Sequence, residues 1–357
     1  MPVTDDIPTL IGRLCRIALV LAASLSASGC YLMQAATGQM ELTSKRQPIA
    51  KLLTDERTPE QLRARLEYVS AARTFASQEL GLPDNDSYRS YADVGRPYVV
   101  WNVFATDEFS VKPKRWCFPI AGCVVYRGYF KEASAKKYAR RLRFHGSDTA
   151  VGGVAAYSTL GHFKDPVLNT MLGWSDVQLA STLFHELAHQ VVYVPGDSEF
   201  NEAFATVVEE AGLQRWLASR GRLQDLDEWN EQRERNAQFV ALLLQTRERL
   251  ETLYQSDLSD AEKRDRKQYE FGVLKLHYSQ LKTEQWKGYR GYDAWFSRTL
   301  NNAHLVSAAT YYGCVPGLRR LLQSVDGDLP AFYDKVRVLA KESKEARAAA
   351  VCSEGVE

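Results

Sequence analysis

His185, Glu186 and His189 stand in the order H-E-x-x-H, a spacing that can build a metal site. Residues four apart lie on the same face of an α-helix, so both imidazoles can reach one metal ion. Glu186 would then lie beside the ion, where its carboxylate could accept a proton from a metal-bound water. The three residues therefore indicate metal-dependent hydrolysis. The alternative is a helix whose histidines only satisfy hydrogen bonds in the core.

A catalytic zinc ion usually has three protein ligands and one open position for water. The longer pattern H-E-x-x-H-x-x-G-x-x-H would need Gly at position 192 and His at position 195, where this chain has Val192 and Pro195. Glu202 is the better third ligand, because it follows a Pro-Gly break that lets a second helix fold back. We therefore expect one Zn²⁺ ion, held by His185, His189 and Glu202.

Two helices must position these side chains, one carrying the histidines and one carrying Glu202. Ser175, with Gln178 three residues later, predicts a capping box at the start of the first helix. A stripe of apolar residues at helical spacing would hold that helix in the core. The stripe consists of Val177, Ala180, Phe184, Leu187 and Val191. Asn201 and Glu209, on the same helix as Glu202, are candidates to contact and orient the metal ligands, and for Glu209 the alternative is that its side chain is solvated.

Peptide-bond hydrolysis would also need a hydrogen-bond donor for the tetrahedral oxyanion. The candidates are His304, Tyr311 and Tyr312, in the stretch AHLVSAATYYGC. For each of the three, packing in an aromatic core is the alternative.

The N-terminus predicts export. An apolar run at 17–27 follows Arg13 and Arg16 and precedes Cys30, and it is too short to span a bilayer. This arrangement resembles the bacterial lipoprotein signal, which implies that residues 1–29 are removed and that Cys30 carries a lipid. Tyr31 after the cysteine implies an outer-membrane lipoprotein facing the periplasm. An ordinary cleaved signal and an uncleaved anchor are the alternatives, and both also export the protein.

Composition and cysteine spacing agree with a globular protein in that compartment. The 357 residues carry a net charge of +1 and are 45% hydrophobic, which gives no reason to expect a nucleic-acid partner. Cys117 and Cys123, in WCFPIAGC, are close enough in sequence for a small disulfide loop, with two buried thiols as the alternative. The pairing of Cys314 and Cys352 stays open.

The remaining pattern predicts a helix-rich α+β fold with a small β-sheet. Strands are expected at 98–105, 123–130 and 149–159, and helices at 131–145 and from 329 to about 350. Residues 221–286 are charged and helix-prone, and predict a long antiparallel helical hairpin. The expected segments are a signal at 1–29, a tether and lead-in at 30–57, the metal-binding part at 58–220, the hairpin at 221–286 and a C-terminal helical part at 287–357.

The motif His185-Glu186-x-x-His189 followed by Asn201-Glu202-Ala203-Phe204-Ala205 resembles the glutamate-ligand zinc peptidases, or gluzincins. The chain from GCYLMQAATGQMEL through WCFPIAGC and AYSTLGHFKDP to LNNAHL resembles a bacterial lipoprotein family described as aminopeptidases. These resemblances imply a zincin-like domain, a zinc ion and hydrolysis of peptide substrates. The strand stretch VGGVAAYST, however, lacks the acid with which larger gluzincin aminopeptidases bind the substrate amine.

The expected function is therefore a zinc-dependent peptidase of the bacterial envelope, most simply an aminopeptidase, tethered to the membrane through Cys30. One alternative is a periplasmic endopeptidase for envelope protein quality control. Another is a non-catalytic zinc-containing lipoprotein that acts as a binding module. The natural substrate and the oligomeric state stay open.

Overall fold

The computed structural model describes residue 31 and residues 33–118, 122–156, 158–159, 163–306 and 314–352. The lipidation candidate Cys30 and the oxyanion candidates Tyr311 and Tyr312 therefore lie outside the described residues. The described chain is a helix-rich α+β fold with small sheets, as the sequence predicts. No helix among the described residues is both long and apolar enough to cross a membrane.

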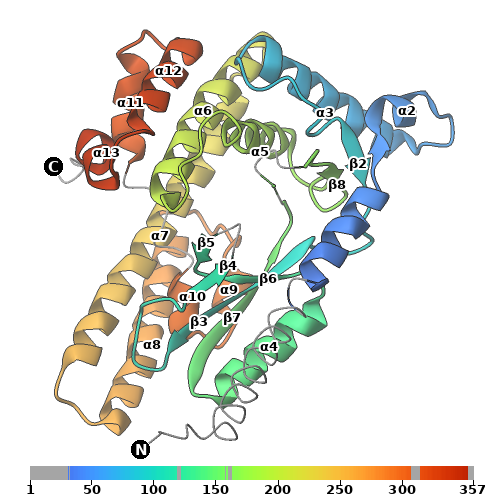
Figure 1. Cartoon of the computed structure of the whole chain (residues 1–357). Coiled ribbons are helices and arrows are strands. Elements are labelled where there is room, and N and C mark those ends of the chain that lie inside the picture. Colours follow the sequence, from blue (N-terminus) through green and yellow to red (C-terminus); the bar gives the residue numbers. More distant parts are fainter. Residues whose placement is uncertain are drawn as a thin grey trace, which may run out of the picture.

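A layer of helices forms the upper part of the molecule and contains the main hydrophobic core (Figure 1). Its central members are α3 (Glu60–Gln78), α5 (Asp176–Ala188) and α6 (Ser198–Ser219). The short helix α2 (Ile49–Thr54) and a three-stranded sheet lie at one end of this layer. That sheet has the order β1 (Gln47–Pro48), β2 (Ser90–Ala92) and β8 (Val167–Leu168). β1 and β2 are antiparallel, and β2 and β8 are parallel.

The lower part is built on a second three-stranded sheet of the order β6-β3-β7. The strands are β6 (Arg127–Tyr129), β3 (Val100–Asp107) and β7 (Ser147–Val154), with both outer strands antiparallel to β3. Helix α4 (Glu132–Phe144) packs against β3 and β7. The prediction of a single strand at 123–130 is wrong. The chain bends at Val125 and Tyr126, which separates β5 (Gly122–Val124) from β6.

A disulfide closes the small hairpin that precedes this bend. β4 (Trp116–Phe118) pairs with β5, and Cys117 lies directly opposite Cys123 in that pairing. The two cysteines form a disulfide bond. The hairpin therefore has a covalent link at the position where the sequence places a small disulfide loop.

The long helical hairpin consists of α7 (Asp225–Gln255) and α8 (Asp260–Glu284), which run from the upper layer down one side of the molecule (Figure 1). A capping box of Ser259 and Glu262 starts α8. The hairpin has its own apolar core, to which α9 (Asp293–Phe296) and α10 (Asn302–Val306) contribute. The salt bridge between Lys267 of α8 and Asp148 of β7 joins the hairpin to the lower sheet.

Two segments differ from the sequence prediction. The expected tether at 30–57 is helical at 33–44 and buries Leu42 in the main core, so this part of the lead-in belongs to the folded body. The single helix expected from 329 to about 350 is wrong, because α12 (Leu329–Leu339) and α13 (Lys344–Val351) are separate. Ser343 starts α13 as its N-cap, accepting a hydrogen bond from the backbone N–H of Ala346.

The C-terminal helices pack on the outside of α6 (Figure 1). α11 (Val315–Gln323) contacts α6 directly and also contacts α12 and α13. A disulfide between Cys314 and Cys352 joins the start of α11 to the end of α13. This covalent link holds the C-terminal helices together as a support for α6.

Candidate metal centre

Helix α5 presents both histidines because most of its remaining surface is buried. Ser175 starts the helix, and its hydroxyl accepts a hydrogen bond from the backbone N–H of Gln178. Arg65 of α3 pairs with Asp176 in the first turn. Seven residues of the helix are buried, and these are Leu179, Ala180, Ser181, Leu183, Phe184, Leu187 and Ala188. The His185 side chain, which is 19% exposed, lies on the remaining face.

A short turn brings α6 back against α5. Gly196 adopts a φ of +82°, a conformation that glycine takes without strain, and Asp197 then caps α6. The Asn201 amide closes this turn, because its Nδ2 donates to the Val194 carbonyl and its Oδ1 accepts from the Val194 N–H, both at 2.8 Å. Asn201 therefore orders the turn before Glu202 and makes no hydrogen bond to the metal-site histidines among the described residues.

His185, His189 and Glu202 converge at the junction of the two helices. Their candidate ligand atoms all lie within 4.8 Å of one another. Oε2 of Glu202 lies 3.2 Å from Nε2 of His185, and Oε1 lies 3.8 Å from Nε2 of His189. Two imidazole nitrogens and a carboxylate are a donor set that suits zinc. The arrangement of these three side chains therefore fits a catalytic zinc ion.

Glu209, two turns further along α6, faces the other nitrogen of His185. Its Oε2 lies 3.0 Å from Nδ1 of that histidine. A carboxylate in this position fixes the ring orientation and leaves Nε2 to face the metal position. His189 has no equivalent, since its buried Nδ1 lacks a hydrogen-bond partner among the described residues.

Burial and the two carboxylates set opposite pKa shifts on the histidines. Burial alone would lower the pKa of His185, but its hydrogen bonds to Glu202 and Glu209 raise that pKa to about 10. Burial and the neighbouring His185 lower the pKa of His189 to about 4. The two carboxylates therefore favour the charged form of His185.

Glu186 directly follows His185 on α5, which is the sequence position of the proton acceptor in H-E-x-x-H motifs. Burial raises the pKa of its carboxyl, and the charge of His185 partly opposes the shift. A carboxylate with a raised pKa accepts a proton more readily than a solvated one. The site thus combines a candidate metal-binding set with an adjacent proton acceptor.

A family model described as "Putative aminopeptidase" matches residues 30–351, which is most of the chain. The chain belongs to this family. It matches no curated protein and no solved structure at a significant level.

In this member of the aminopeptidase family, His304 does not join the metal cluster. The Nδ1 atom of His304 lies 3.0 Å from the Asn301 side chain and accepts from the Asn301 backbone N–H at 3.2 Å. Its ring packs edge-on against Trp295. His304 is therefore packed beside the hairpin core, and its role as an oxyanion donor stays a prediction.

Tyr126 is a residue near the site that the sequence analysis did not single out. Burial raises the pKa of its phenol, and the charges of Tyr193, Glu202 and Glu186 raise it further. Tyr126 lies in the bend between β5 and β6, where the sequence predicted an unbroken strand. The signal in the sequence is its place three residues after Cys123, because a disulfide hairpin fixes the loop that follows it.

Proposed function

We propose that this chain is a zinc-dependent peptidase, a gluzincin-type aminopeptidase with a zincin-like catalytic part. The observation that carries the proposal is the convergence of His185, His189 and Glu202 within 4.8 Å, with Glu186 directly after the first histidine. When bound, zinc supplies positive charge that lowers the pKa of a coordinated water and polarises the substrate carbonyl. Membership of the aminopeptidase family supports peptide hydrolysis as the reaction.

Residues of the protein transfer the proton and orient the metal ligands. Glu186 accepts a proton from the attacking water as its oxygen forms a bond to the carbonyl carbon. The same carboxyl then gives that proton to the amine nitrogen as the carbon–nitrogen bond breaks. Glu209 holds the His185 ring in a fixed orientation, with Oε2 3.0 Å from Nδ1.

We assign the oxyanion donor to Tyr126. The charges of Glu202 and Glu186 raise the pKa of its phenol, and no described residue makes a hydrogen bond with that phenol. A phenol O–H directed at the developing oxyanion would stabilise the charge as the tetrahedral intermediate forms. Tyr311 and Tyr312, outside the described residues, stay alternative donors.

We place the enzyme in the bacterial envelope, as a lipoprotein anchored through Cys30 to the outer membrane and facing the periplasm. The support is the basic and apolar sequence before Cys30, together with two disulfides, which persist in oxidising compartments. Tyr31, directly after the proposed anchor, packs edge-on against Tyr129 and stacks on Arg127. The anchor would therefore hold the lower sheet close to the membrane surface.

Peptide cleavage with and without a chelator tests the proposed function. The zinc-loaded protein should cleave short peptides, lose this activity with chelator and regain it when zinc is restored. Peptides with a free N-terminus should be cleaved and N-acetylated ones should not. Equal cleavage of both forms would instead show an endopeptidase, and zinc binding without cleavage of any peptide would show a binding module.

A further inference from the structure

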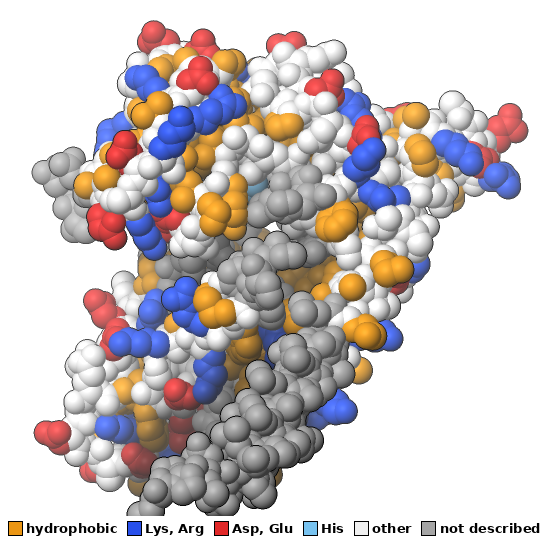
Figure 2. All heavy atoms as spheres, in the orientation of Figure 1, with side chains coloured by type: hydrophobic (Ala, Val, Ile, Leu, Met, Phe, Trp, Pro, Cys, Tyr) orange, Lys and Arg blue, Asp and Glu red, His pale blue; other side chains and the backbone are white. Residues whose placement is uncertain are grey.

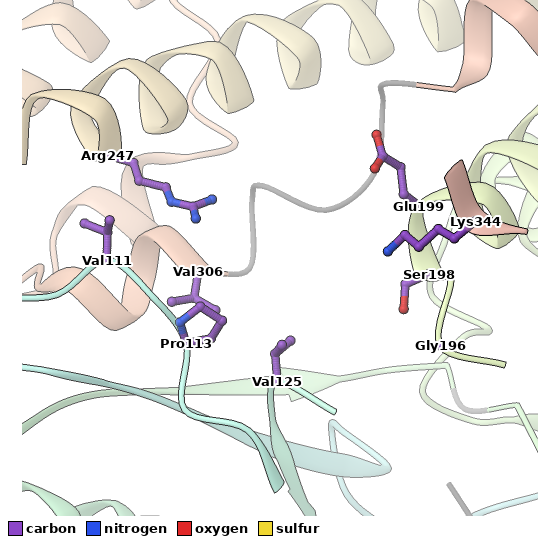
Figure 3. Close-up of a pocket in the computed structure, with 9 residues that line it drawn as sticks. All are labelled: Val111, Pro113, Val125, Gly196, Ser198, Glu199, Arg247, Val306 and Lys344. Atoms are coloured by element: carbon purple, nitrogen blue, oxygen red, sulfur yellow. The ribbon is translucent and has the colours of Figure 1, made fainter. Parts of the chain in front are cut away.

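A pocket lies where the hairpin, the turn between α5 and α6, and the lower part of the molecule meet (Figure 3). Its volume is about 280 Å³. The apolar part of its wall consists of Val111, Pro113, Val125 and Val306. In the space-filling view, the surface is indented between the upper helical layer and the lower part (Figure 2).

Three charged side chains line the same pocket. Arg247 of α7 and Lys344 of α13 extend toward one another from opposite walls, and Glu199 of α6 lies beside Lys344 (Figure 3). None of these side chains makes a hydrogen bond or an ion pair with another described residue. Two cations and one carboxylate give the pocket a formal charge of +1 (2 − 1). This net positive charge therefore favours a ligand with an anionic group.

Arg247 differs from the other arginines of its helix. Arg233, Arg235 and Arg249 of α7 each pair with a glutamate. Arg247 is half-buried and has no such partner among the described residues. A guanidinium presents a rigid set of N–H donors that matches a carboxylate with two parallel hydrogen bonds. Arg247 is therefore placed to bind a carboxylate supplied from outside the chain.

The pocket adjoins the metal centre on the α6 side. Glu199 precedes Glu202 by three positions, which corresponds to a rise of about 4.5 Å along the helix. Val125 directly precedes Tyr126, the proposed oxyanion donor. An extended peptide advances about 3.3–3.6 Å per residue, so one short peptide can reach both places.

We propose that Arg247, assisted by Lys344, binds a carboxylate group of the peptide substrate in this pocket. The proposal rests on the proposed function, because it makes the pocket a subsite of the same enzyme. The carboxylate can come from two sources, the C-terminus of a short peptide or an acidic side chain. Either source gives the enzyme a preference for substrates with a negative charge near the bond that is cleaved.

Matched peptides separate the two sources. The first pair is the tripeptide Leu-Gly-Gly with a free or an amidated C-terminus. The second set consists of amidated tripeptides in which one position at a time carries either Glu or Gln, and each Glu peptide is compared with its Gln counterpart. Peptide binding is measured by calorimetry on the full chain carrying Glu186→Gln, which should cleave the peptide far more slowly, with and without each pocket variant. The value of kcat/KM is measured separately on the zinc-loaded enzyme with Glu186 intact. We expect the carboxylate form of at least one pair to bind about 10- to 100-fold more tightly, as hydrogen bonds between charged groups do.

The pocket variants are Arg247→Ala, Arg247→Lys and Lys344→Ala. Arg247→Ala should bring the ratio between the carboxylate and neutral forms close to one, and Arg247→Lys should restore part of it. Arg266→Ala, which removes an exposed arginine from α8, is the matched control and should keep the full ratio. The thermal midpoint of each variant checks that it is folded.

The outcomes separate this proposal from the proposed function. The pair of peptides in which tighter binding of the carboxylate form depends on Arg247 identifies the source of the carboxylate. Equal binding of all matched pairs, or a preference that survives Arg247→Ala, would overturn the pocket proposal even if peptides are cleaved. Arg247-dependent binding of carboxylates without cleavage of any peptide would support the pocket and contradict the peptidase.

Discussion

Glu209 and Glu210 are neighbours on α6, yet their carboxylates have different partners. Glu209 lies 3.0 Å from Nδ1 of His185. Glu210 pairs with Arg319 of α11 and with Arg233 of α7. One carboxylate thus orients a candidate zinc ligand, and the next one holds α6 against its supporting helices.

This difference gives a matched pair of variants. Glu209→Gln should lower zinc affinity about 10- to 100-fold, because the ring of His185 loses its charged acceptor. Glu210→Gln should leave zinc affinity close to that of the unaltered protein. Competition with a chromophoric chelator measures both values. Equal zinc affinity in Glu209→Gln and the unaltered protein would show that Glu209 does not act on the ligand.

The sequence could predict the residues that lie near one another along the chain. H-E-x-x-H is a local pattern on one helix, and Glu202 follows it closely. Roles that depend on side-chain direction were harder to predict. Asn201 orders the turn before α6, and His304 belongs to the core shared with the hairpin, because tertiary packing decides where each side chain points.

At the scale of elements, the close approach of α5 and α6 sets the distance between His185 and Glu202. Gly212 of α6 lies at this contact. A Cβ atom at that position would come within 2.7 Å of Leu80 and 3.1 Å of Phe184. Both of those side chains are fully buried, so neither has free space into which it can move.

Gly212→Ala should therefore destabilise the protein and weaken zinc binding. Overpacking costs about 1–3 kcal/mol, which exceeds the gain of about 1 kcal/mol from replacing a helical glycine. Gly272→Ala in α8 is the control, since nothing lies within 4 Å of its added Cβ, and it should stabilise the protein slightly. Urea unfolding measures the stability of both variants. A higher midpoint for Gly212→Ala than for Gly272→Ala would contradict the packing argument.

Element boundaries were predictable where a capping residue marks them. Ser175 starts α5 as the sequence predicted. The break between α12 and α13 was missed, although Ser343 caps the second helix, because the Lys and Glu residues on both sides of Ser343 are good helix formers. The bend at Tyr126 was missed because its residues are all typical of a strand.

At the scale of the whole molecule, the C-terminus holds the start of the glutamate-bearing helix. Arg347 of α13 donates two hydrogen bonds to Oδ2 of Asp197, at 3.0 and 2.8 Å. Both side chains are buried, with exposures of 6% and 7%. Asp197 also caps α6, so this ion pair fixes the turn that leads to Glu202. No local pattern could predict a contact between residues 150 positions apart.

Arg347→Met should lower the free energy of unfolding by about 3–5 kcal/mol, because it leaves the Asp197 carboxylate buried without its partner. The control is Arg337→Met, which breaks the exposed pair with Asp334 and should cost about 1 kcal/mol or less. Urea unfolding followed by circular dichroism measures the two changes. Equal small effects of both variants would show that the C-terminal helices do not hold α6.

Zinc content and peptidase activity, measured together on Glu186→Gln, test the central claim most directly. We predict one zinc ion per chain in both the unaltered protein and the variant, since Glu186 is not a ligand. Peptide cleavage by the variant should fall by about 10²- to 10⁴-fold, because the proton acceptor is lost. Full activity of Glu186→Gln with zinc bound, or the absence of stoichiometric zinc from the unaltered protein, would contradict the account.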